Sequence, residues 1–170
     1  MINIFLLGMP SSGKSTLGRQ LAKQLGYHYF DMDKVIEELE QMTVAEIFAQ
    51  KGEEYFRKLE RKVIKTLPID SRLVVSTGGG APCFFDNISL IKSKGRSIYF
   101  DVPVETLYER MLNTKRNDRP LYQKDDPTLI TTLRQKYIDR QPFYTQADLV
   151  IAGADITIEQ VLEALHFKAS

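Results

Sequence analysis

Apolar residues along the chain fall into short runs that alternate with longer stretches of helical period. Five runs have the character of buried strands, because each is mostly apolar and is bounded by polar or turn-forming residues. These runs are Ile2–Leu7, Tyr27–Phe30, Leu73–Ser76, Ser97–Phe100 and Asp148–Ile151. Continuous apolar runs are typical of parallel strands that are covered on both faces. The pattern therefore predicts an α/β fold of three layers around a parallel sheet.

Between these runs, apolar residues recur every three or four positions, as they do on the buried face of a helix. The first helix follows residue 15 and ends at Gly26. A capping box, Thr43-x-x-Glu46, opens a second and short helix, which Gly52 closes. A third helix carries an apolar stripe and ends before Pro68. These two helices form an insertion of the kind that usually holds a substrate.

The last third of the chain contains two further helices with recognisable starts. Asp126 and Pro127 are suited to the N-cap and the first helical position, and the helix is predicted to run to Gln141, just before the next proline. Thr157-x-x-Gln160 caps the final helix. The order of elements continues the alternation of strand and helix, in agreement with an α/β fold.

Composition is that of one globular domain, and it excludes several classes of function. A chain of 170 residues holds one proper core. The net charge of +1 predicts no general affinity for nucleic acid or for anionic membranes. No apolar run approaches the roughly 20 residues of a membrane span, and the N-terminus enters a strand without a signal-peptide pattern. We therefore expect a cytoplasmic monomer that binds a small-molecule substrate.

The single cysteine, Cys83, cannot form an internal disulfide. With only two histidines in the chain, no soft-ligand metal cluster is expected. Cys83 is either a nucleophile or a small, partly buried side chain, and the second interpretation is favoured. Any metal is expected to be Mg²⁺ that arrives with a nucleotide.

A complete G-x-x-x-x-G-K-[ST] loop occupies residues 8–15, directly after the first apolar run. Its glycines let successive backbone N–H groups turn inward around phosphate, at the point where a strand ends and a helix begins. Lys14 is expected to reach the β- and γ-phosphates, and the Ser15 hydroxyl to bind Mg²⁺. A glycine-rich turn without a ligand is the alternative. The residues expected to bind nucleotide are Gly8, Ser11, Ser12, Gly13, Lys14, Ser15 and Thr16.

A phosphate loop alone is compatible with a motor, a switch, a transporter ATPase or a small kinase. The residues that would bind a phosphoryl acceptor are needed to distinguish these classes. Asp31 and Asp33 end the second strand. Alternate residues of a strand share a face, so both carboxylates can point to the edge of the sheet where ligands bind. One can orient the Mg²⁺ shell through water, and the other can accept a hydroxyl proton. Alternatively, Asp33 caps a helix that begins near Lys34.

Two arginines are candidates for holding an anionic group. Arg57 lies beside the apolar stripe of its helix, and Glu60 one turn later can hold its guanidinium. Arg140 lies three residues after Tyr137 and seven after Leu133, which places it on the packed face of its helix. A buried guanidinium needs an anion, and a substrate carboxylate would supply one. The alternative for Arg140 is an arginine that snorkels at a helix end.

Three consecutive glycines, Gly78, Gly79 and Gly80, follow the third strand. Ordering three glycines on folding costs much conformational entropy. Close contact between a ligand and the exposed backbone usually offsets this cost. Their position at the carboxyl end of a strand favours ligand contact over a flexible loop.

Residues 110–126 are rich in charge and show no apolar period, so we expect a mobile surface segment. Within it, Arg119 is followed by a proline. Such an arginine suits a lid that closes over the transferring phosphate. A solvated charged loop is the alternative.

Together, in this order and spacing, these elements make the chain resemble the shikimate kinases. The resemblance covers essentially the whole chain and also includes the helix Ala45-Glu46-Ile47-Phe48 and the motif Arg140-x-Pro142-x-Tyr144. It implies a P-loop fold like that of nucleoside monophosphate kinases, with sheet order 2-3-1-4-5. It also implies transfer of the γ-phosphoryl group of ATP to the 3-hydroxyl of shikimate. The implied parts are a core (1–31, 68–109 and 127–170), a substrate-binding insertion (about 32–67) and a lid (about 110–126).

The resemblance also assigns roles to individual residues. It implies that Asp33 binds the shikimate hydroxyls and serves as the base, and that Arg57 and Arg140 hold the carboxylate. Arg119 becomes the lid arginine, which acts with Lys14 on the transferring phosphate. Asp31 and Ser15 are the expected Mg²⁺ ligands, Asp31 through water. The glycines that line the shikimate pocket are Gly78, Gly79 and Gly80.

The sequence departs from the family at one place. Members often carry an Arg/Asn-Pro type of adenine loop after the last strand, whereas this chain has Ala152-Gly153-Ala154-Asp155. Adenine contacts must then come from backbone groups or from other side chains, such as Arg110 or Arg116.

Two other functions stay open at this point. A related kinase such as gluconate kinase also acts on a hydroxy acid, but the Asp-x-Asp, Phe-Arg-x-x-Glu and triple-glycine elements favour shikimate. A nucleotide switch is a different class, and the chain contains no Asn-Lys-x-Asp tetrapeptide that would read guanine.

Overall fold

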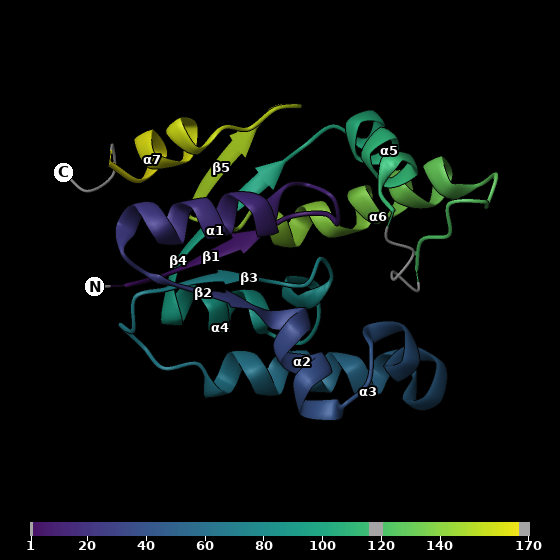
Figure 1. Cartoon of the computed structure of the whole chain (residues 1–170), viewed down its shortest axis with the longest axis horizontal. Helices are drawn as coiled ribbons and strands as arrows, with labels where there is room; N and C mark the ends of the chain where they lie inside the picture. The colour runs from purple at the N-terminus through teal and green to yellow at the C-terminus, as the bar shows by residue number, and fades with distance from the viewer. Residues whose placement is uncertain (1, 116–120, 167–170) are drawn as a thin grey trace.

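A computed structural model describes residues 2–115 and 121–166 of the chain. Figure 1 shows a central sheet with helices packed around it. Along the chain, the elements are β1 (Asn3–Leu7), α1 (Lys14–Leu25), β2 (His28–Asp31), α2 (Met32–Glu40), α3 (Val44–Thr66), β3 (Leu73–Ser76), the 3-10 turn η1 (Ala81–Cys83), α4 (Asn87–Lys94), β4 (Gly95–Asp101), α5 (Val104–Asn113), α6 (Leu129–Tyr144), β5 (Leu149–Ala152) and α7 (Ile158–His166).

Within the described residues, the sheet has five strands, all parallel, in the order β2-β3-β1-β4-β5. This confirms the fold class and the strand order that the family resemblance implies. Because the strands are parallel, their carboxyl ends meet at one edge, toward which the arrows of Figure 1 point. Loops after these ends are where an open α/β sheet binds its ligands.

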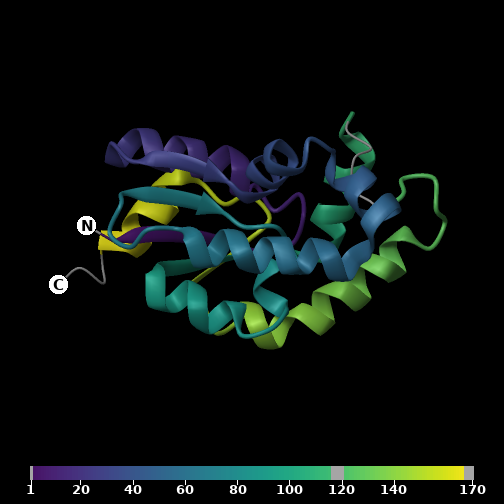
Figure 2. The ribbon, with the colours of Figure 1, turned by 90° about the horizontal axis from the view of Figure 1, so that it is seen from below.

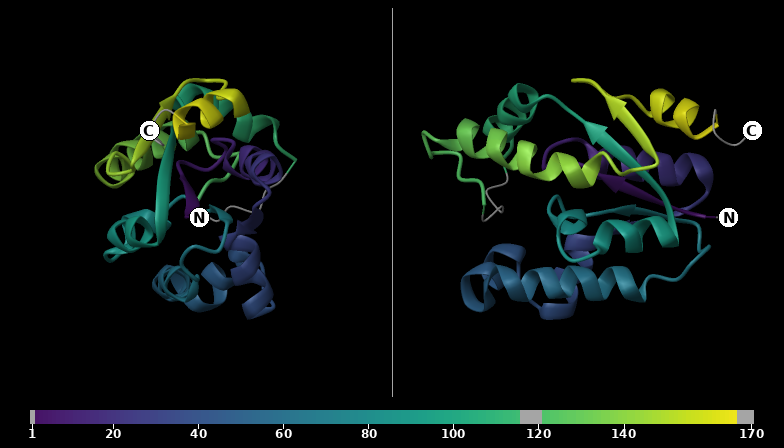
Figure 3. Two further views of the ribbon diagram at one scale, coloured as in Figure 1. Left: turned by 90° about the vertical axis from the view of Figure 1, so that its left-hand side faces the viewer. Right: turned by 180° about the vertical axis from the view of Figure 1, so that it is seen from behind.

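Two apolar cores sandwich the sheet, one on each face. On one face, Ile4 and Leu6 of β1 pack with Leu21 of α1 and with α7. On the other face, Phe5 and Leu7 pack with residues of α3, α4, α5 and α6. Figure 2 shows α1 on one side of the strands and α4 and α6 on the other, and the rear view of Figure 3 shows α4 and α6 covering the back of the sheet. All five residues of β1 are buried, as expected of a strand covered on both faces.

Helix α3 spans the predicted boundary between two helices. Its capping box is confirmed, because Thr43 Oγ1 accepts from the Glu46 N–H and the Glu46 carboxylate accepts from the Thr43 N–H. Gly52 has φ +82° and ψ 167°, outside the helical region, so the predicted break at this glycine exists as a kink inside the element. The kink separates a short first segment from the segment that carries Arg57.

The predicted limits of α6 are wrong at both ends. Asp126 does not cap the helix, because its carboxylate accepts from the N–H and the hydroxyl of Thr128, and the helix begins at Leu129. The helix also continues through Pro142 to Tyr144. A proline in the last turn removes a single backbone donor, and the Thr145 N–H still donates to the Gln141 carbonyl, so the last turn persists.

Two other boundaries differ from expectation. Residues 110–113 belong to α5 rather than to an irregular segment. Helix α2 begins at Met32, immediately after β2, so Asp33 lies on a helix and the two-residue strand period does not relate it to Asp31. Among the described helices, none combines the length and the apolar character that crossing a membrane requires.

Candidate active site

A cavity of about 920 Å³ lies at the carboxyl edge of the sheet. Segments from the two sides of this edge line it: the phosphate loop, α2, α3, the loop after β3, and α6. The cavity gathers most residues that the sequence singles out. Those on its wall are Ser11, Ser12, Gly13, Lys14, Ser15, Thr16, Asp31, Asp33, Arg57, Gly78, Gly79, Gly80 and Arg140.

The phosphate loop has the backbone shape that its glycines were predicted to permit. Gly8 has φ +149°, and a methyl group there would lie 2.9 Å from the Phe100 carbonyl oxygen. Gly13 has φ +94° and is the N-cap of α1. The buried Lys14 Nζ donates to the carbonyl oxygens of Gly8 (2.7 Å) and Met9 (2.9 Å). The ammonium is thus held against the loop, at the positive end of a helix, where phosphate binds.

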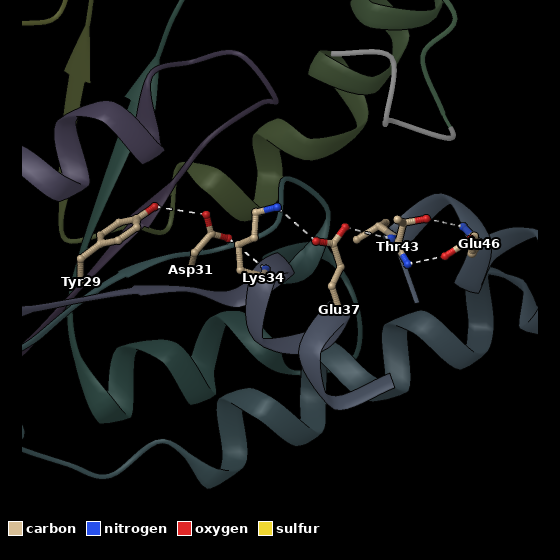
Figure 4. Close-up of polar contacts among 7 residues, drawn as sticks. Tyr29, Asp31, Lys34, Glu37, Thr43 and Glu46 are labelled. Atoms are coloured by element: carbon tan, nitrogen blue, oxygen red, sulfur yellow. Dashed lines mark hydrogen bonds and ion pairs between the residues drawn. The ribbon is translucent and has the colours of Figure 1, made fainter. Parts of the chain in front are cut away.

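Asp31 and Asp33 occupy different structural positions beside this loop. The Asp31 carboxylate caps α2 by accepting from the Lys34 N–H (3.3 Å), and it also accepts from the Tyr29 hydroxyl (3.4 Å), as Figure 4 shows. The capping role considered for Asp33 therefore belongs to Asp31. Asp33 lies in the first turn of α2, and its Oδ1 would be 3.0 Å from a methyl group placed on Gly78. Its carboxylate is therefore beside the glycine loop.

Glu37 joins α2 to the start of α3. Its carboxylate accepts from the Val44 N–H (3.1 Å) and pairs with the Lys34 ammonium (3.3 Å), as seen in Figure 4. Because the Val44 N–H is one of the donors that a helix leaves unpaired at its first turn, this contact satisfies it. The contact ties the helix that carries Asp33 to the one that carries Arg57.

Arg57 is buried and compensated by two carboxylates of its own helix. Its Nη1 donates to Glu60 (2.8 Å), and its Nε and Nη2 donate to Glu53 (3.2 and 3.0 Å). The guanidinium carbon also lies 4.3 Å from the centre of the Phe84 ring. The sequence predicted the contact with Glu60, but as an ordinary helix-surface pair; the burial of both partners makes it a stronger constraint.

Burial raises the pKa of the Glu60 carboxyl to about 7, although the neighbouring Arg57 guanidinium opposes the shift. Asp33 adds to the rise, because a second negative charge disfavours ionisation of Glu60. At neutral pH, the Glu60 carboxyl therefore has a much stronger tendency to hold a proton than an exposed glutamate.

Arg140 is equally buried but has a different environment. Its Nη1 lies 3.8 Å from the Met9 sulfur. Among residues 2–115 and 121–166, no carboxylate comes within ion-pair distance of it. The structure therefore rules out a snorkelling side chain and places on the wall of the cavity a guanidinium that forms no ion pair with any described carboxylate.

The glycine loop fits between these charged side chains. A methyl group on Gly78 would lie 2.6 Å from a Glu60 carboxylate oxygen, and one on Gly80 would lie 2.6 Å from Arg57 Nη1. At Gly79, it would lie 3.0 Å from Arg140 Nη1. The sequence attributed the three glycines to a ligand against bare backbone. The structure adds a reason, which is that Glu60 at Gly78, Pro10 at Gly79 and Arg57 at Gly80 each lie closer than 3 Å to the place of a side-chain carbon.

Cys83 follows the glycine loop and is partly buried, as the favoured interpretation expected. Burial raises the pKa of its thiol to about 11, and the Arg140 guanidinium only partly opposes this. Since the thiolate is the nucleophilic form, a thiol that stays protonated at neutral pH is poorly suited to covalent catalysis.

Arg110 connects the phosphate loop to the loop after β5. It donates to the Ser11 carbonyl (3.0 Å) and to the Ala154 carbonyl (2.6 Å), and it lines the cavity. Arg110, one of the two arginines suggested to contact adenine, therefore lies next to residues 152–155, where the sequence differs from the family pattern. The other, Arg116, lies outside the described residues, as does the predicted lid arginine Arg119.

Several residues of the site escaped the sequence analysis. Glu53 was not singled out from the sequence, although its position four residues before Arg57 is a standard helix-pair spacing. Tyr122 is buried on the cavity wall, and the adjacent pair Leu121-Tyr122 is the apolar signal inside an otherwise charged segment. Tyr144 was quoted only as the end of a family motif and was given no role. It is fully buried and contacts Gly79, which no local pattern indicates because the two residues are 65 positions apart.

The fold and the cavity define a class of protein: a P-loop kinase that can hold a small acidic acceptor beside a nucleotide. A sheet of order 2-3-1-4-5 carries the phosphate loop after its central strand, and two buried arginines and a carboxylate share the cavity with it. The family model for shikimate kinase matches residues 10–167. The chain belongs to the shikimate kinase family.

Individual relatives agree with this assignment. The chain is 43% identical over 155 residues to a shikimate kinase of Clostridium botulinum (strain Loch Maree / Type A3), covering 91% of this chain and 89% of the relative. A shikimate kinase of Sulfurihydrogenibium sp. is 40% identical and covers 99% of this chain and 98% of its own. The solved Acinetobacter baumannii shikimate kinase in complex with shikimate has a TM-score of 0.87 at 31% identity, covering 99% and 92%.

A solved gluconokinase from Sinorhizobium meliloti shares the fold, with a TM-score of 0.60 at 17% identity over 97% of this chain and 90% of its own. At this identity, the similarity concerns the fold alone. This neighbour therefore supports the alternative of gluconate kinase only through a shared fold.

Proposed function

We propose that the cavity transfers the γ-phosphoryl group of ATP to the 3-hydroxyl of shikimate, giving shikimate 3-phosphate and ADP. The observation that carries this proposal is the meeting of Arg57, Arg140 and Asp33 on the wall of the cavity that contains the phosphate loop. Shikimate is a small acid with several hydroxyls, so its pocket needs cations for one carboxylate and an acceptor for hydroxyl protons.

On the acceptor side, Arg57 and Arg140 hold the substrate carboxylate. Arg57 is oriented by Glu53 and Glu60, so its guanidinium is preorganised before substrate arrives. Arg140 supplies the charge that no described carboxylate neutralises. The three glycines let the substrate approach the backbone between them.

In the transfer step, the oxygen of the substrate hydroxyl forms a bond to the γ-phosphorus, and Asp33 accepts the proton that this hydroxyl loses. The bond from that phosphorus to the bridging oxygen of ADP breaks at the same time. Asp33 suits this role because it lies in the first turn of helix α2, beside the glycine loop and on the wall of the cavity.

On the donor side, the phosphate loop binds ATP and Lys14 contacts the β- and γ-phosphates. Ser15 is exposed at the start of α1, and Asp31 lines the same cavity, so the oxygen donors that Mg²⁺ prefers are present. Ser15 would hold the ion directly and Asp31 through water. When bound, Mg²⁺ neutralises charge on the phosphates. Arg119 is proposed to act on the same phosphates from the segment at about 110–126, and residues 32–67 to form the substrate-binding insertion.

The acceptor assignment is tested by measuring ADP release with Mg²⁺ and ATP in the presence of shikimate, of gluconate or of a nucleoside monophosphate. We expect turnover with shikimate and little with the others. Equal turnover with gluconate, or ATP hydrolysis that is indifferent to any acceptor, would contradict the proposal.

The role of Asp33 is tested by Asp33→Asn. We expect phosphoryl transfer to fall by at least about a hundredfold in kcat, since general bases contribute roughly 10²–10⁴-fold. ATP affinity, measured by calorimetry, should be retained because Asp33 belongs to the acceptor side. Glu38→Gln, on the exposed face of the same helix, is the matched control and should leave kcat unchanged. Loss of ATP binding in Asp33→Asn would instead point to a structural or metal role.

A further inference from the structure

The second half of helix α6 presents polar side chains to the protein interior, whereas its first half presents Leu129 and Leu133. The Tyr137 hydroxyl donates to Asp101 (2.7 Å), and the Gln141 amide donates to the Tyr99 hydroxyl (2.6 Å). Arg140 and Tyr144 share this buried face. Residues 137, 140, 141 and 144 have the spacing of one helical stripe. The stripe fastens α6 to the carboxyl end of β4, next to the cavity.

Tyr144 extends this attachment to the glycine loop. Its side chain is fully buried, with its ring centre 4.9 Å from that of Tyr99. Its hydroxyl donates to the Gly79 carbonyl oxygen and lies 3.9 Å from the Met9 sulfur. A single hydroxyl therefore joins the last turn of α6 to the middle of the loop after β3.

This loop is the spacer between the two arginines. Its backbone at Gly79 packs against the Arg140 guanidinium, and at Gly80 against the Arg57 guanidinium. A methyl group would lie 2.6 Å from Arg57 Nη1 at Gly80 and 3.0 Å from Arg140 Nη1 at Gly79, so the loop backbone lies directly against both cations. A shift of the loop would therefore disturb the positions of both guanidinium groups. The bond from Tyr144 fixes the loop relative to the helix that carries Arg140.

We propose that Tyr144 is a positioning residue for the substrate carboxylate: by holding the Gly79 carbonyl, it keeps the glycine loop and Arg140 in the register that lets Arg57 and Arg140 bind one carboxylate. The proposal rests on the proposed function for the identity of that carboxylate. In this proposal, Tyr144 affects substrate binding through the glycine loop and does not itself contact the substrate.

The test is Tyr144→Phe, which keeps the buried ring and its packing on Tyr99 while removing the hydroxyl. One net hydrogen bond corresponds to roughly 1 kcal/mol, so we expect the KM for shikimate to rise about fivefold. The KM for ATP and kcat should stay within about twofold, because the contact of the Tyr144 hydroxyl with the phosphate loop is to the Met9 sulfur, which is a weak acceptor. A shikimate KM that does not change would overturn the proposal.

Tyr137→Phe is the matched control, since it removes a tyrosine hydroxyl from the same helix at a site away from the glycine loop. It should lower the unfolding midpoint about as much as Tyr144→Phe and leave the KM for shikimate unchanged. An equal rise in both variants would assign the effect to α6 as a whole and would overturn the specific role of Tyr144.

A double-mutant cycle with Arg140→Lys measures the coupling between the two positions in the KM for shikimate. A purely structural role of Tyr144 would produce no such coupling. If Tyr144 acts by placing Arg140, its effect on the KM for shikimate shrinks when Arg140 is already replaced, and additive effects would overturn the link. The wild-type assay with and without shikimate separates the outcomes. Failure of the proposed function would appear there, whereas failure of this inference appears only in the variants.

Discussion

The two arginines of the cavity are equally buried but differ in how their charge is compensated. Arg57 on α3 pairs with Glu53 and Glu60, whereas Arg140 on α6 has no carboxylate within ion-pair distance in the described part of the chain and is influenced by Glu60 only from farther away. Isolated buried charge is expensive, and paired buried charge much less so. The protein therefore stabilises one cation by itself and leaves the other to be neutralised by substrate.

This difference separates two tasks that a carboxylate receptor must perform. Arg57 is part of the fold, because its removal would leave Glu60 buried without its partner. Arg140 contributes to binding at the expense of stability, because its charge gains a partner only in the complex. We expect substitutions at the two positions to affect shikimate binding in the same direction and stability in opposite directions.

The largest effect is expected for the stability of Arg57→Met. Removing one partner of a buried pair costs about 4 kcal/mol, so the free energy of unfolding should fall by this amount at pH 8, where Glu60 is ionised. Urea denaturation measures it. Arg61→Met is the matched control on the same helix; its partner Asp86 is exposed, so its loss should stay below about 1 kcal/mol. Equal losses in both variants would remove the distinction.

Arg140→Met should weaken shikimate binding by roughly a hundredfold, or about 3 kcal/mol, because the substrate carboxylate loses a buried charged partner. In contrast to Arg57→Met, the unliganded variant should have a higher Tm than the wild type. Calorimetry with shikimate and thermal unfolding without it measure the two quantities. Arg134→Met, at an exposed position of α6, should change neither. A lowered Tm for Arg140→Met would contradict an uncompensated charge.

The raised pKa of Glu60 predicts how stability depends on pH. The folded protein holds this proton up to about pH 7, whereas the unfolded chain releases it near 4.5. The stability that Glu60 contributes at low pH is therefore lost as the pH rises, by about 2 kcal/mol between pH 5 and pH 7. The difference between wild type and Glu60→Gln in urea denaturation over this range isolates the contribution. A flat difference, or one of the opposite sign, would contradict the shift.

The smallest effect is expected for Glu53→Gln. The Glu53 side chain is 42% exposed, so its pair with Arg57 is screened by solvent and should contribute only about 0.5 kcal/mol to stability. Glu54→Gln, whose pair with Lys58 is more exposed still, is the matched control and should have no measurable effect. A loss at Glu53 as large as that at Arg57 would mean that Glu53, rather than Glu60, is the main partner.

Local signals predicted most of the elements. The five apolar runs, the Thr43 capping box and the break at Gly52 depend on neighbouring residues, and all are present. The order of the strands came from the family resemblance, since periodicity does not say which strands pair. The end of α6 was misplaced because a proline usually stops a helix, whereas here the tertiary contacts of Gln141 and Tyr144 hold the last turn.

Site residues were predictable where spacing brings them together on one element, as for Arg57 and Glu60. Spacing does not predict burial. Burial strengthens the Arg57–Glu60 pair and raises the pKa of Glu60. The sequence also did not predict that Arg57 is paired with carboxylates and Arg140 is not, because this difference depends on the groups that other elements place next to each guanidinium. The Tyr144 contact with Gly79 needs the folded sheet to exist at all.

The environment of Cys83 has a practical consequence for spectroscopy. The chain has no tryptophan, and its one cysteine carries a thiol whose pKa is raised to about 11. Maleimide dyes react through the thiolate, so at neutral pH this thiol should label far more slowly than a cysteine introduced on the surface. The natural sequence therefore gives a low background for tryptophan-selective excitation and for thiol labelling, so that one added tryptophan or cysteine would report from a single known place.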